Sequence, residues 1–153
     1  MDNNNNSGLS TLSSNPTNGR RLLVVGAGGF IGGHIARRAI ELGYETWVAV
    51  RETTSRRFLD DDRLHFLTLD YDDGDALARS MGEALPEGEK WDFIIYNLGA
   101  TKCTNFADFN KVNYRYLRTF VETLIACDLV PVRFLYMSSL SALGRGDEEH
   151  YTP

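Results

Sequence analysis

Three glycines stand three residues apart in one short segment, which reads Val24-Val25-Gly26-Ala27-Gly28-Gly29-Phe30-Ile31-Gly32. Glycine permits a tight turn, lets backbone approach a pyrophosphate closely, and lets a helix pack against a strand. A helix that begins here would add unpaired N–H groups and the positive end of its dipole. The segment therefore predicts a loop that binds the phosphates of a dinucleotide, rather than a glycine-rich turn without a ligand.

A charged pair follows the next apolar run, which ends Val48-Ala49-Val50-Arg51-Glu52. Arg51 lies 19 residues after Gly32 (51 − 32), where an acidic residue would bind the ribose hydroxyls of NAD and an arginine would accept the 2′-phosphate of NADP. Arg56 and Arg57 could add positive charge. Glu52 could instead take the ribose hydroxyls, and Arg51 could be a solvated strand end. We expect NADP, with NAD as the alternative.

Metal and thiol chemistry find no support in the sequence. Cys103 and Cys127 belong to no Cys-x-x-Cys or Cys/His cluster, and His34 and His65 have no partner at metal-ligand spacing. We therefore expect no metal site. Two isolated cysteines are typical of reduced thiols in a cytoplasmic protein.

Five short apolar runs alternate with amphipathic stretches. The runs are Leu22–Val25, Thr46–Val50, Leu64–Leu69, Phe93–Tyr96 and Phe134–Met137. Most are continuous rather than alternating, which is typical of parallel strands covered by helices on both faces. The pattern predicts an α/β fold of Rossmann type, a doubly wound parallel sheet with strand order 3-2-1-4-5 and right-handed crossovers.

Three helices are expected between these runs, over Phe30–Leu42, Asp73–Ala84 and Phe106–Ala126. The first carries a stripe of Ile31, Ile35, Ala39 and Leu42 and ends at Gly43. The third carries Phe109, Val112, Tyr116, Phe120 and Leu124 as a single long helix. Phe30, inside the glycine loop, should point into the core.

Composition is that of one ordinary globular domain. The 153 residues are 42% hydrophobic and 24% charged, with a net charge of −5. The acidic balance argues against a nucleic-acid binder, and the sequence has no apolar run of about 18–20 residues that could cross a membrane. Residues 1–19 are mostly Asn, Ser, Thr, Gly and Pro and predict a disordered leader before a domain over 20–153.

The glycine segment, Gly-x-x-Gly-Phe-Ile-Gly, resembles that of the extended short-chain dehydrogenases/reductases, which include NAD(P)-dependent epimerases, dehydratases and dihydroflavonol-type reductases. Further matches follow in order. Leu69-Asp70-Tyr71 resembles the family's adenine-contacting loop, Asn97-Leu98-Gly99-Ala100 resembles a segment beside the cofactor, and Asn113 matches an Asn of the long helix. The cofactor-binding residues implied by pattern and resemblance are Gly26, Gly28, Gly29, Phe30, Ile31, Gly32, Arg51, Asp70, Tyr71, Leu98, Gly99, Ala100, Asn113 and Ser138.

The resemblance also implies a catalytic hydroxyl. Phe134-Leu135-Tyr136-Met137-Ser138-Ser139-x4-Gly144 resembles the fifth strand and its serine turn. The family's hydroxyl lies five positions before the glycine, which gives Ser139, although Ser138 or Ser141 could be the true contact. This serine would hold the substrate oxygen.

The family's tyrosine and lysine do not fall within this sequence. No tyrosine has a lysine four residues later, and Tyr151 would need position 155. We expect the catalytic tyrosine to lie a few residues beyond Pro153, in a longer enzyme of which this is the cofactor-binding half. The implied substrate is a sugar nucleotide or another carbonyl or alcohol compound. The rival hypothesis is a non-catalytic dinucleotide-binding module.

That reading has two physical consequences. The fragment should bind cofactor and show almost no turnover. The fifth strand should be an open edge of the sheet, truncated before a sixth strand, so the chain should self-associate.

Overall fold

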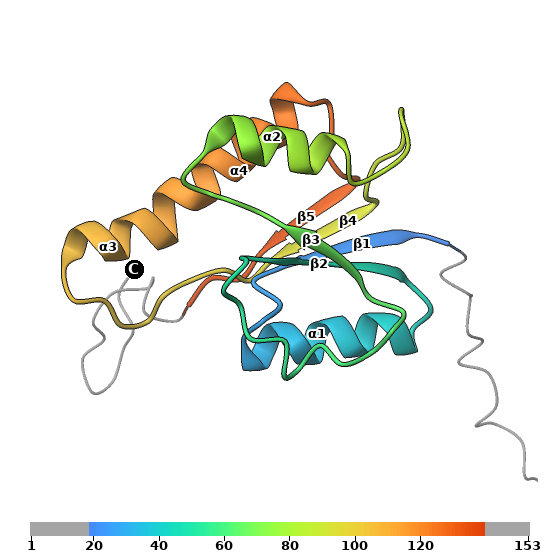
Figure 1. Ribbon diagram of the computed structural model, residues 1–153, viewed down its shortest axis with the longest axis horizontal. Coiled ribbons are helices and arrows are strands. Elements are labelled where there is room, and N and C mark those ends of the chain that lie inside the picture. The colour runs from blue at the N-terminus through green and yellow to red at the C-terminus, as the bar shows by residue number, and fades with distance from the viewer. Residues whose placement is uncertain (1–18, 140–153) are drawn as a thin grey trace, which may run out of the picture.

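The computed structural model describes residues 19–139 and contains one five-stranded parallel sheet (Figure 1). The strands are β1 (Arg21–Val25), β2 (Glu45–Val50), β3 (His65–Thr68), β4 (Phe93–Tyr96) and β5 (Arg133–Tyr136). Their order is β3-β2-β1-β4-β5, with every pair parallel, which confirms the predicted doubly wound topology. Most of the leader, residues 1–18, and the segment 140–153 with Ser141, Gly144 and Tyr151 lie outside the described residues.

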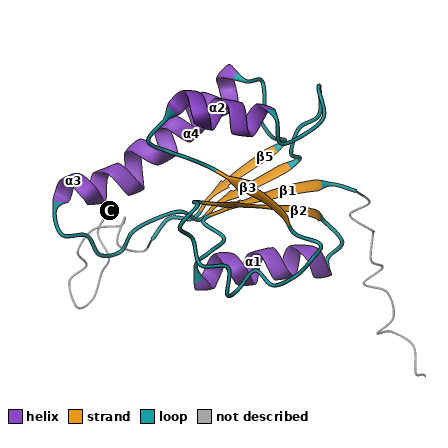
Figure 2. Ribbon diagram, in the orientation of Figure 1, coloured by secondary structure: helices purple, strands orange, loops and turns teal. Residues whose placement is uncertain are grey.

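Helices cover both faces of the sheet. Helix α1 (Phe30–Glu41) lies on one face, and α2 (Gly74–Gly82) and α4 (Tyr116–Ala126) lie together on the other (Figures 1 and 2). Asp73 precedes α2 as its N-cap, and its carboxylate accepts the N–H groups of Asp75 and Ala76. The predicted first residue of this helix, Asp73, is therefore its N-cap, one residue before α2 begins.

The sequence pattern predicted a single α-helix over Phe106–Ala126, but the structure interrupts it with a π turn. The helix consists of α3 (Phe106–Asn110), a π-helical turn η1 (Lys111–Arg115) and α4. Asn113 lies in the π turn, and its side-chain amide donates to the carbonyl of Phe109 at 3.1 Å. A π turn closes i→i+5 bonds and so rotates the residues that follow it relative to an ordinary helix. Apolar spacing alone cannot reveal that extra residue.

The face of α1 that contacts the sheet is also different from the predicted stripe. The buried residues are Gly32, Gly33, Ala36, Ala39 and Ile40, whereas Ile31 and Leu42 are exposed. Small residues occupy the contact because α1 begins directly against the backbone of the glycine loop. Phe30 is 65% exposed, so the expectation that it points into the core is wrong. With Ile31, it lines an apolar groove of about 570 Å³ beside α1.

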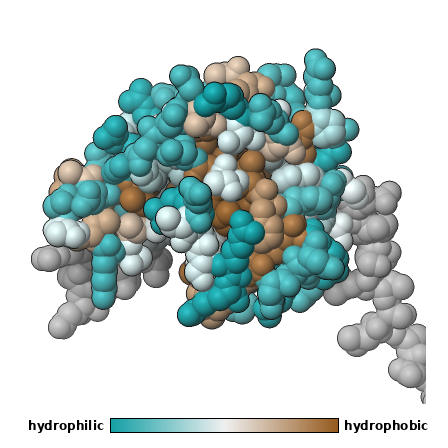
Figure 3. All heavy atoms as spheres, in the orientation of Figure 1, coloured by the Kyte–Doolittle hydropathy of each residue, from teal (hydrophilic) through white to brown (hydrophobic). Residues whose placement is uncertain are grey.

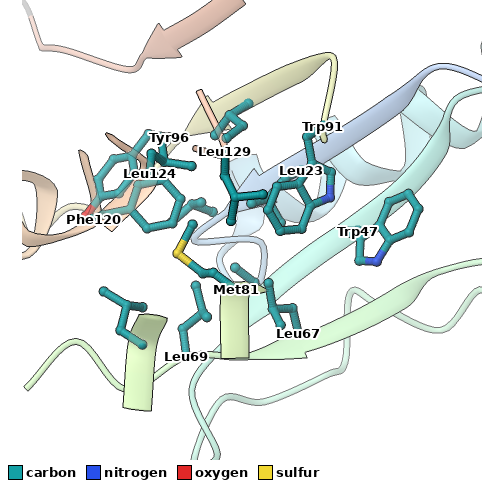
Figure 4. Packing of buried hydrophobic residues seen from close by; sticks show 14 of the residues in the cluster. Leu23, Trp47, Leu67, Leu69, Met81, Trp91, Tyr96, Phe120, Leu124 and Leu129 are labelled. Carbon is teal, nitrogen blue, oxygen red and sulfur yellow. The ribbon is translucent and has the colours of Figure 1, made fainter. Parts of the chain in front are cut away.

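The larger part of the core lies between the sheet and the α2–α4 layer. Trp91 packs near Leu23, and Phe120 lies beside Tyr96 with ring centroids 5.4 Å apart (Figure 4). Met81 of α2 is fully buried in the same cluster. Burial of each such side chain contributes on the order of 1.5–3 kcal/mol. This layer therefore stabilises the sheet, whose carboxyl ends carry the loops described below.

The surface view shows the same layers from outside. Brown apolar side chains lie in a band between the hydrophilic surfaces of the two helical layers (Figure 3). Among the described residues, no helix is long and apolar enough to span a membrane.

Candidate functional site

A cavity of about 1110 Å³ lies at the carboxyl ends of the strands. Its walls are the loops that follow β1, β2 and β4, together with residues after β3 and β5. These connections gather at one end of the sheet, at the left in Figure 2. Strand order reverses between β1 and β4, and in doubly wound sheets ligands bind in the crevice at that point.

Two glycines of the triplet are required by the fold itself. Gly26 has φ +79°, and an added Cβ would lie 2.7 Å from the backbone nitrogen of Leu98. An added Cβ on Gly32 would lie 2.8 Å from the Cα of Ala27, closer than real Cβ contacts. Gly26 therefore allows the turn after β1 to lie against the loop after β4, and Gly32 allows α1 to begin against the turn. Gly32 does not line the cavity.

Gly29 differs from both because the fold leaves it room. An added Cβ would meet only the carbonyl oxygen of Gly26, at an ordinary 3.8 Å. Gly29 is the N-cap of α1, with φ −82° and ψ 168°, and it provides no side-chain cap. The first turn of α1 carries no acidic residue. The start of α1 therefore presents backbone N–H groups and positive potential to the cavity.

The loop after β2 closes over the glycine turn. Thr54 lies where a side chain on Gly28 would have to be, and its hydroxyl accepts the backbone N–H of Arg51 at 2.9 Å. Arg51 lines the cavity together with Thr53, Thr54 and Ser55. Three hydroxyl side chains therefore accompany the arginine at this wall.

The other charged residues of this loop do not line the cavity. The Arg56 guanidinium lies 4.3 Å from the ring centroid of Phe66, and that of Arg57 lies 4.4 Å from Phe58. Glu52 is exposed and is not among the lining residues. Of the charged residues considered from the sequence, Arg51 alone faces this space within the part of the chain that the structure describes.

Tyr71 forms the wall after β3. Its side chain is buried, and burial raises the pKa of its phenol well above the usual value, while the positive charge of Arg51 acts in the opposite direction. Asp70 does not line the cavity. Its carboxylate accepts the backbone N–H of Asp72 at 2.9 Å and shapes the loop that carries Tyr71.

Asn113 fixes the loop after β4. The Ala100 N–H donates to Asn113 Oδ1 at 2.9 Å, and Asn113 Nδ2 donates to the Ala100 carbonyl at 3.0 Å. An added Cβ on Gly99 would lie 3.1 Å from Asn113 Oδ1, so the small residue permits this contact. Ser138 and Ser139 line the cavity from the end of β5.

The structure brings most of the predicted site residues to this one cavity. Those that line it are Gly26, Gly28, Gly29, Phe30, Ile31, Arg51, Tyr71, Leu98, Gly99, Ala100, Asn113, Ser138 and Ser139. Gly32 and Asp70 do not. Lining residues absent from the prediction include Thr53, Thr54, Ser55, Phe109 and Tyr136. For Thr53, Thr54 and Ser55, the sequence did carry a signal, because three hydroxyl residues follow closely after Arg51.

No group of three or more His, Cys, Asp or Glu side chains that could hold a metal ion occurs within residues 19–139. The polar groups of the cavity wall are instead glycine backbone, hydroxyl groups, amide groups and one arginine, set among apolar side chains such as Ile31, Leu98 and Phe109. Such a donor set suits phosphate, ribose and planar rings.

Solved structures resemble this fold closely. A protein from Burkholderia multivorans named as a short-chain alcohol dehydrogenase is 27% identical, with a TM-score of 0.67 over 80% of this chain and 64% of that one. A second protein from the same species, named as a short-chain dehydrogenase/reductase and bound to NADP, is 26% identical, with a TM-score of 0.66 over 80% and 60%. A protein from Burkholderia cenocepacia named as an epimerase is 25% identical, with a TM-score of 0.67 over 83% and 40%.

The chain thus spans 40–64% of the length of these three structures. A sequence comparison with curated proteins finds no significant match. A profile of the NAD dependent epimerase/dehydratase family matches residues 22–153, and the chain belongs to that family.

Proposed function

We propose that residues 20–153 are the cofactor-binding part of an NADP-dependent oxidoreductase or epimerase acting on a sugar nucleotide or another carbonyl or alcohol substrate. The observation that carries the proposal is Gly29. It caps α1 without a side chain, and it lines a cavity at the β1–β4 switch point although the fold leaves room there for a Cβ. A ligand that approaches this backbone explains the glycine, since packing does not.

The residues of the cavity suit a nicotinamide dinucleotide. Backbone N–H groups around Gly29 would hold the pyrophosphate, and Tyr71 and Arg51 would lie beside the adenosine portion. Ser139 would hold the substrate oxygen as the catalytic residue, with Ser138 beside the cofactor. When bound, the nicotinamide supplies or accepts a hydride, and the protein contributes orientation and hydrogen bonds.

The test of the proposal is Gly29→Val. The φ and ψ of Gly29 lie in the region that β-branched residues favour, so the variant should fold while its side chain enters the cavity. We expect calorimetry to show NADPH binding to the wild type and at least about tenfold weaker binding to Gly29→Val, equivalent to about 1.4 kcal/mol. Gly82→Val is the matched control, because nothing lies within 4 Å of a Cβ added there. Equal affinity in wild type and Gly29→Val would refute the proposal.

NADP is favoured over NAD because Arg51 faces the cavity and Glu52 does not. The relative with bound NADP supports the same choice. A charge-assisted contact contributes about 1.5–3 kcal/mol before solvent exposure reduces it, so Arg51→Ala should remove up to about one to two decades of preference for NADPH over NADH. Arg57→Ala, whose guanidinium lies over Phe58, should keep the preference. A wild type that prefers NADH would disprove this assignment.

A non-catalytic dinucleotide-binding module is the second candidate. Within these 153 residues, no tyrosine has a lysine four positions later. Without that pair, general acid–base help worth about 10²–10⁴-fold is missing. We therefore propose that the 153-residue chain binds NADPH but oxidises it at most very slowly with aldehydes, ketones or nucleotide sugars. Robust turnover in that assay would rule out a non-catalytic module. It would also show that the reaction does not need the absent tyrosine and lysine.

A further inference from the structure

The π turn η1 contacts two separate loops of the cavity. Asn113, in the middle of the turn, holds the loop after β4 through Ala100. Lys111, its first residue, reaches the loop after β3, where its Nζ lies 2.7 Å from Asp72 Oδ1. One five-residue turn therefore connects both walls of the cavity.

A second residue of the long helix binds the same carboxylate. The Tyr116 hydroxyl donates to Asp72 Oδ2 at 2.8 Å, so each carboxylate oxygen has its own partner. Both hydrogen bonds hold the pKa of the Asp72 carboxyl below its usual value, with the Lys111 bond as the larger cause. Lys111 and Asp72 are substantially exposed, and such ion pairs contribute little by themselves. The buried tyrosine ring makes this site different from an ordinary surface pair.

The π turn is the reason these two side chains converge. The Tyr116 N–H donates to the Lys111 carbonyl, an i→i+5 bond that stacks the two residues along the helix. The Lys111 Nζ lies 5.5 Å from the Tyr116 ring centroid. In a regular α-helix, residues five apart point about 140° away from each other, so one carboxylate could not receive both.

What this arrangement holds in place is Tyr71. Tyr71 is the neighbour of Asp72 in sequence, its ring centroid lies 5.2 Å from that of Tyr116, and it lines the cavity. Tyr71 lines the same cavity as Arg51, to which we assign the adenosine phosphate. Fixing Asp72 therefore fixes the wall of the adenosine side.

We propose that Asp72, Lys111 and Tyr116 form a latch that positions Tyr71 and thereby sets the affinity for the adenosine half of the dinucleotide. The three are positioning residues, since none of them lines the cavity. The inference rests on the proposed function for its ligand, but the latch itself is a property of the unliganded chain. Merely structural residues would change stability without distinguishing the two halves of the cofactor.

Tyr116→Phe tests the latch because it removes the hydroxyl and keeps the ring that packs on Tyr71. We expect calorimetry to show about three- to tenfold weaker binding of 2′,5′-ADP, the adenosine-half probe, and unchanged binding of reduced nicotinamide mononucleotide. Asp72→Asn also removes the charge that pairs with Lys111, so it should weaken binding at least as much. The double variant should lose less than the sum of the two single variants, because both changes act on the Tyr116–Asp72 contact. Arg118→Gln is the control, since it breaks an exposed ion pair with Glu122 on the same helix.

Hydrogen exchange without ligand separates this inference from the proposed function. In Tyr116→Phe, amides of residues 69–73 should exchange at least about threefold faster, while those of β1 stay unchanged. Unchanged exchange at 69–73, or equal losses for both cofactor halves, would overturn the latch even if wild type binds NADPH well. If wild type binds no dinucleotide, the proposed function fails and the exchange result alone decides the latch.

Discussion

The two edges of the sheet, β3 and β5, are built differently. In β3, Leu67 is buried while His65 stacks on Trp47 with ring centroids 4.5 Å apart, and Arg56 covers the Phe66 ring. In β5, all four residues of Arg133–Tyr136 are exposed. The β3 edge therefore carries cationic and polar groups around Phe66, whereas β5 carries three partly exposed apolar or aromatic side chains, Phe134, Leu135 and Tyr136, beside Arg133.

The two edges differ in how well they discourage pairing with another chain. An edge strand leaves N–H and C=O groups unpaired, and charged or covered edges discourage pairing with another chain. The β3 edge has such protection from Arg56 and His65. The β5 edge has the sequence of a central strand, with Phe134 and Tyr136 toward Tyr96 and Phe120 on one side and Leu135 exposed beside them. We infer that β5 is a surface suited to cover by further polypeptide.

The largest expected effect tests whether the cluster next to β5 is a finished core. Phe120→Ala removes a ring that is 0% exposed and should lower the free energy of unfolding by about 3–5 kcal/mol. Phe134→Ala removes a ring from the same cluster that is 36% exposed, and should cost less than half as much. Chemical denaturation of both variants measures the difference. Equal losses would mean that β5 is packed as completely as the centre of the sheet.

Sequence patterns predicted the strands well because central parallel strands must be apolar throughout. All five runs became strands whose ends lie within one residue of the predicted ends, in the predicted order. The glycine spacing likewise placed Gly26 at the cavity, because its φ of +79° and the nearby Leu98 backbone exclude a side chain. Local rules with a strong steric cause transfer directly from sequence to structure.

The failures have equally specific causes. The buried face of α1 is set by contact with the glycine turn, which selects Gly32 and Ala36 over the larger Ile31. The π turn is accompanied by contacts with a distant segment, since its Asn113 forms two hydrogen bonds with Ala100 of the loop after β4. The Asp72 latch needs that turn and cannot be read from spacing. Tertiary contacts decided each of these cases, and no periodicity within one segment encodes them.

The second expected effect concerns self-association. An apolar edge with unpaired backbone groups should pair with a second copy, so sedimentation across a dilution series should show concentration-dependent oligomers. Leu135→Lys should raise the apparent dissociation constant at least about tenfold, because a charge in the contact must lose its water. Phe66→Lys introduces the same charge at the β3 edge and should leave the apparent dissociation constant unaltered. If the two variants behave alike, the contrast between the edges does not govern association.

The smallest expected effect lies in the loop that leads into β3. Two hydrogen bonds from the Arg63 guanidinium, at 2.9 and 2.7 Å, lower the pKa of the Asp61 carboxyl from 3.8 to about 2. A carboxyl with a lowered folded-state pKa stabilises the fold above its unfolded value, and this contribution is lost as pH falls from about 4 toward 2. Asp61→Asn should therefore flatten the stability curve in that window and leave the curve's shape near pH 7 unchanged, with Asp60→Asn as the neighbouring control. Because Arg63 is exposed and Asp61 is partly exposed, the effect should also shrink in high salt, which screens surface charges. If Asp61→Asn keeps the wild-type slope between pH 4 and 2, this ion pair contributes nothing to the stability of the fold, and the loop that leads into β3 is held by its other contacts.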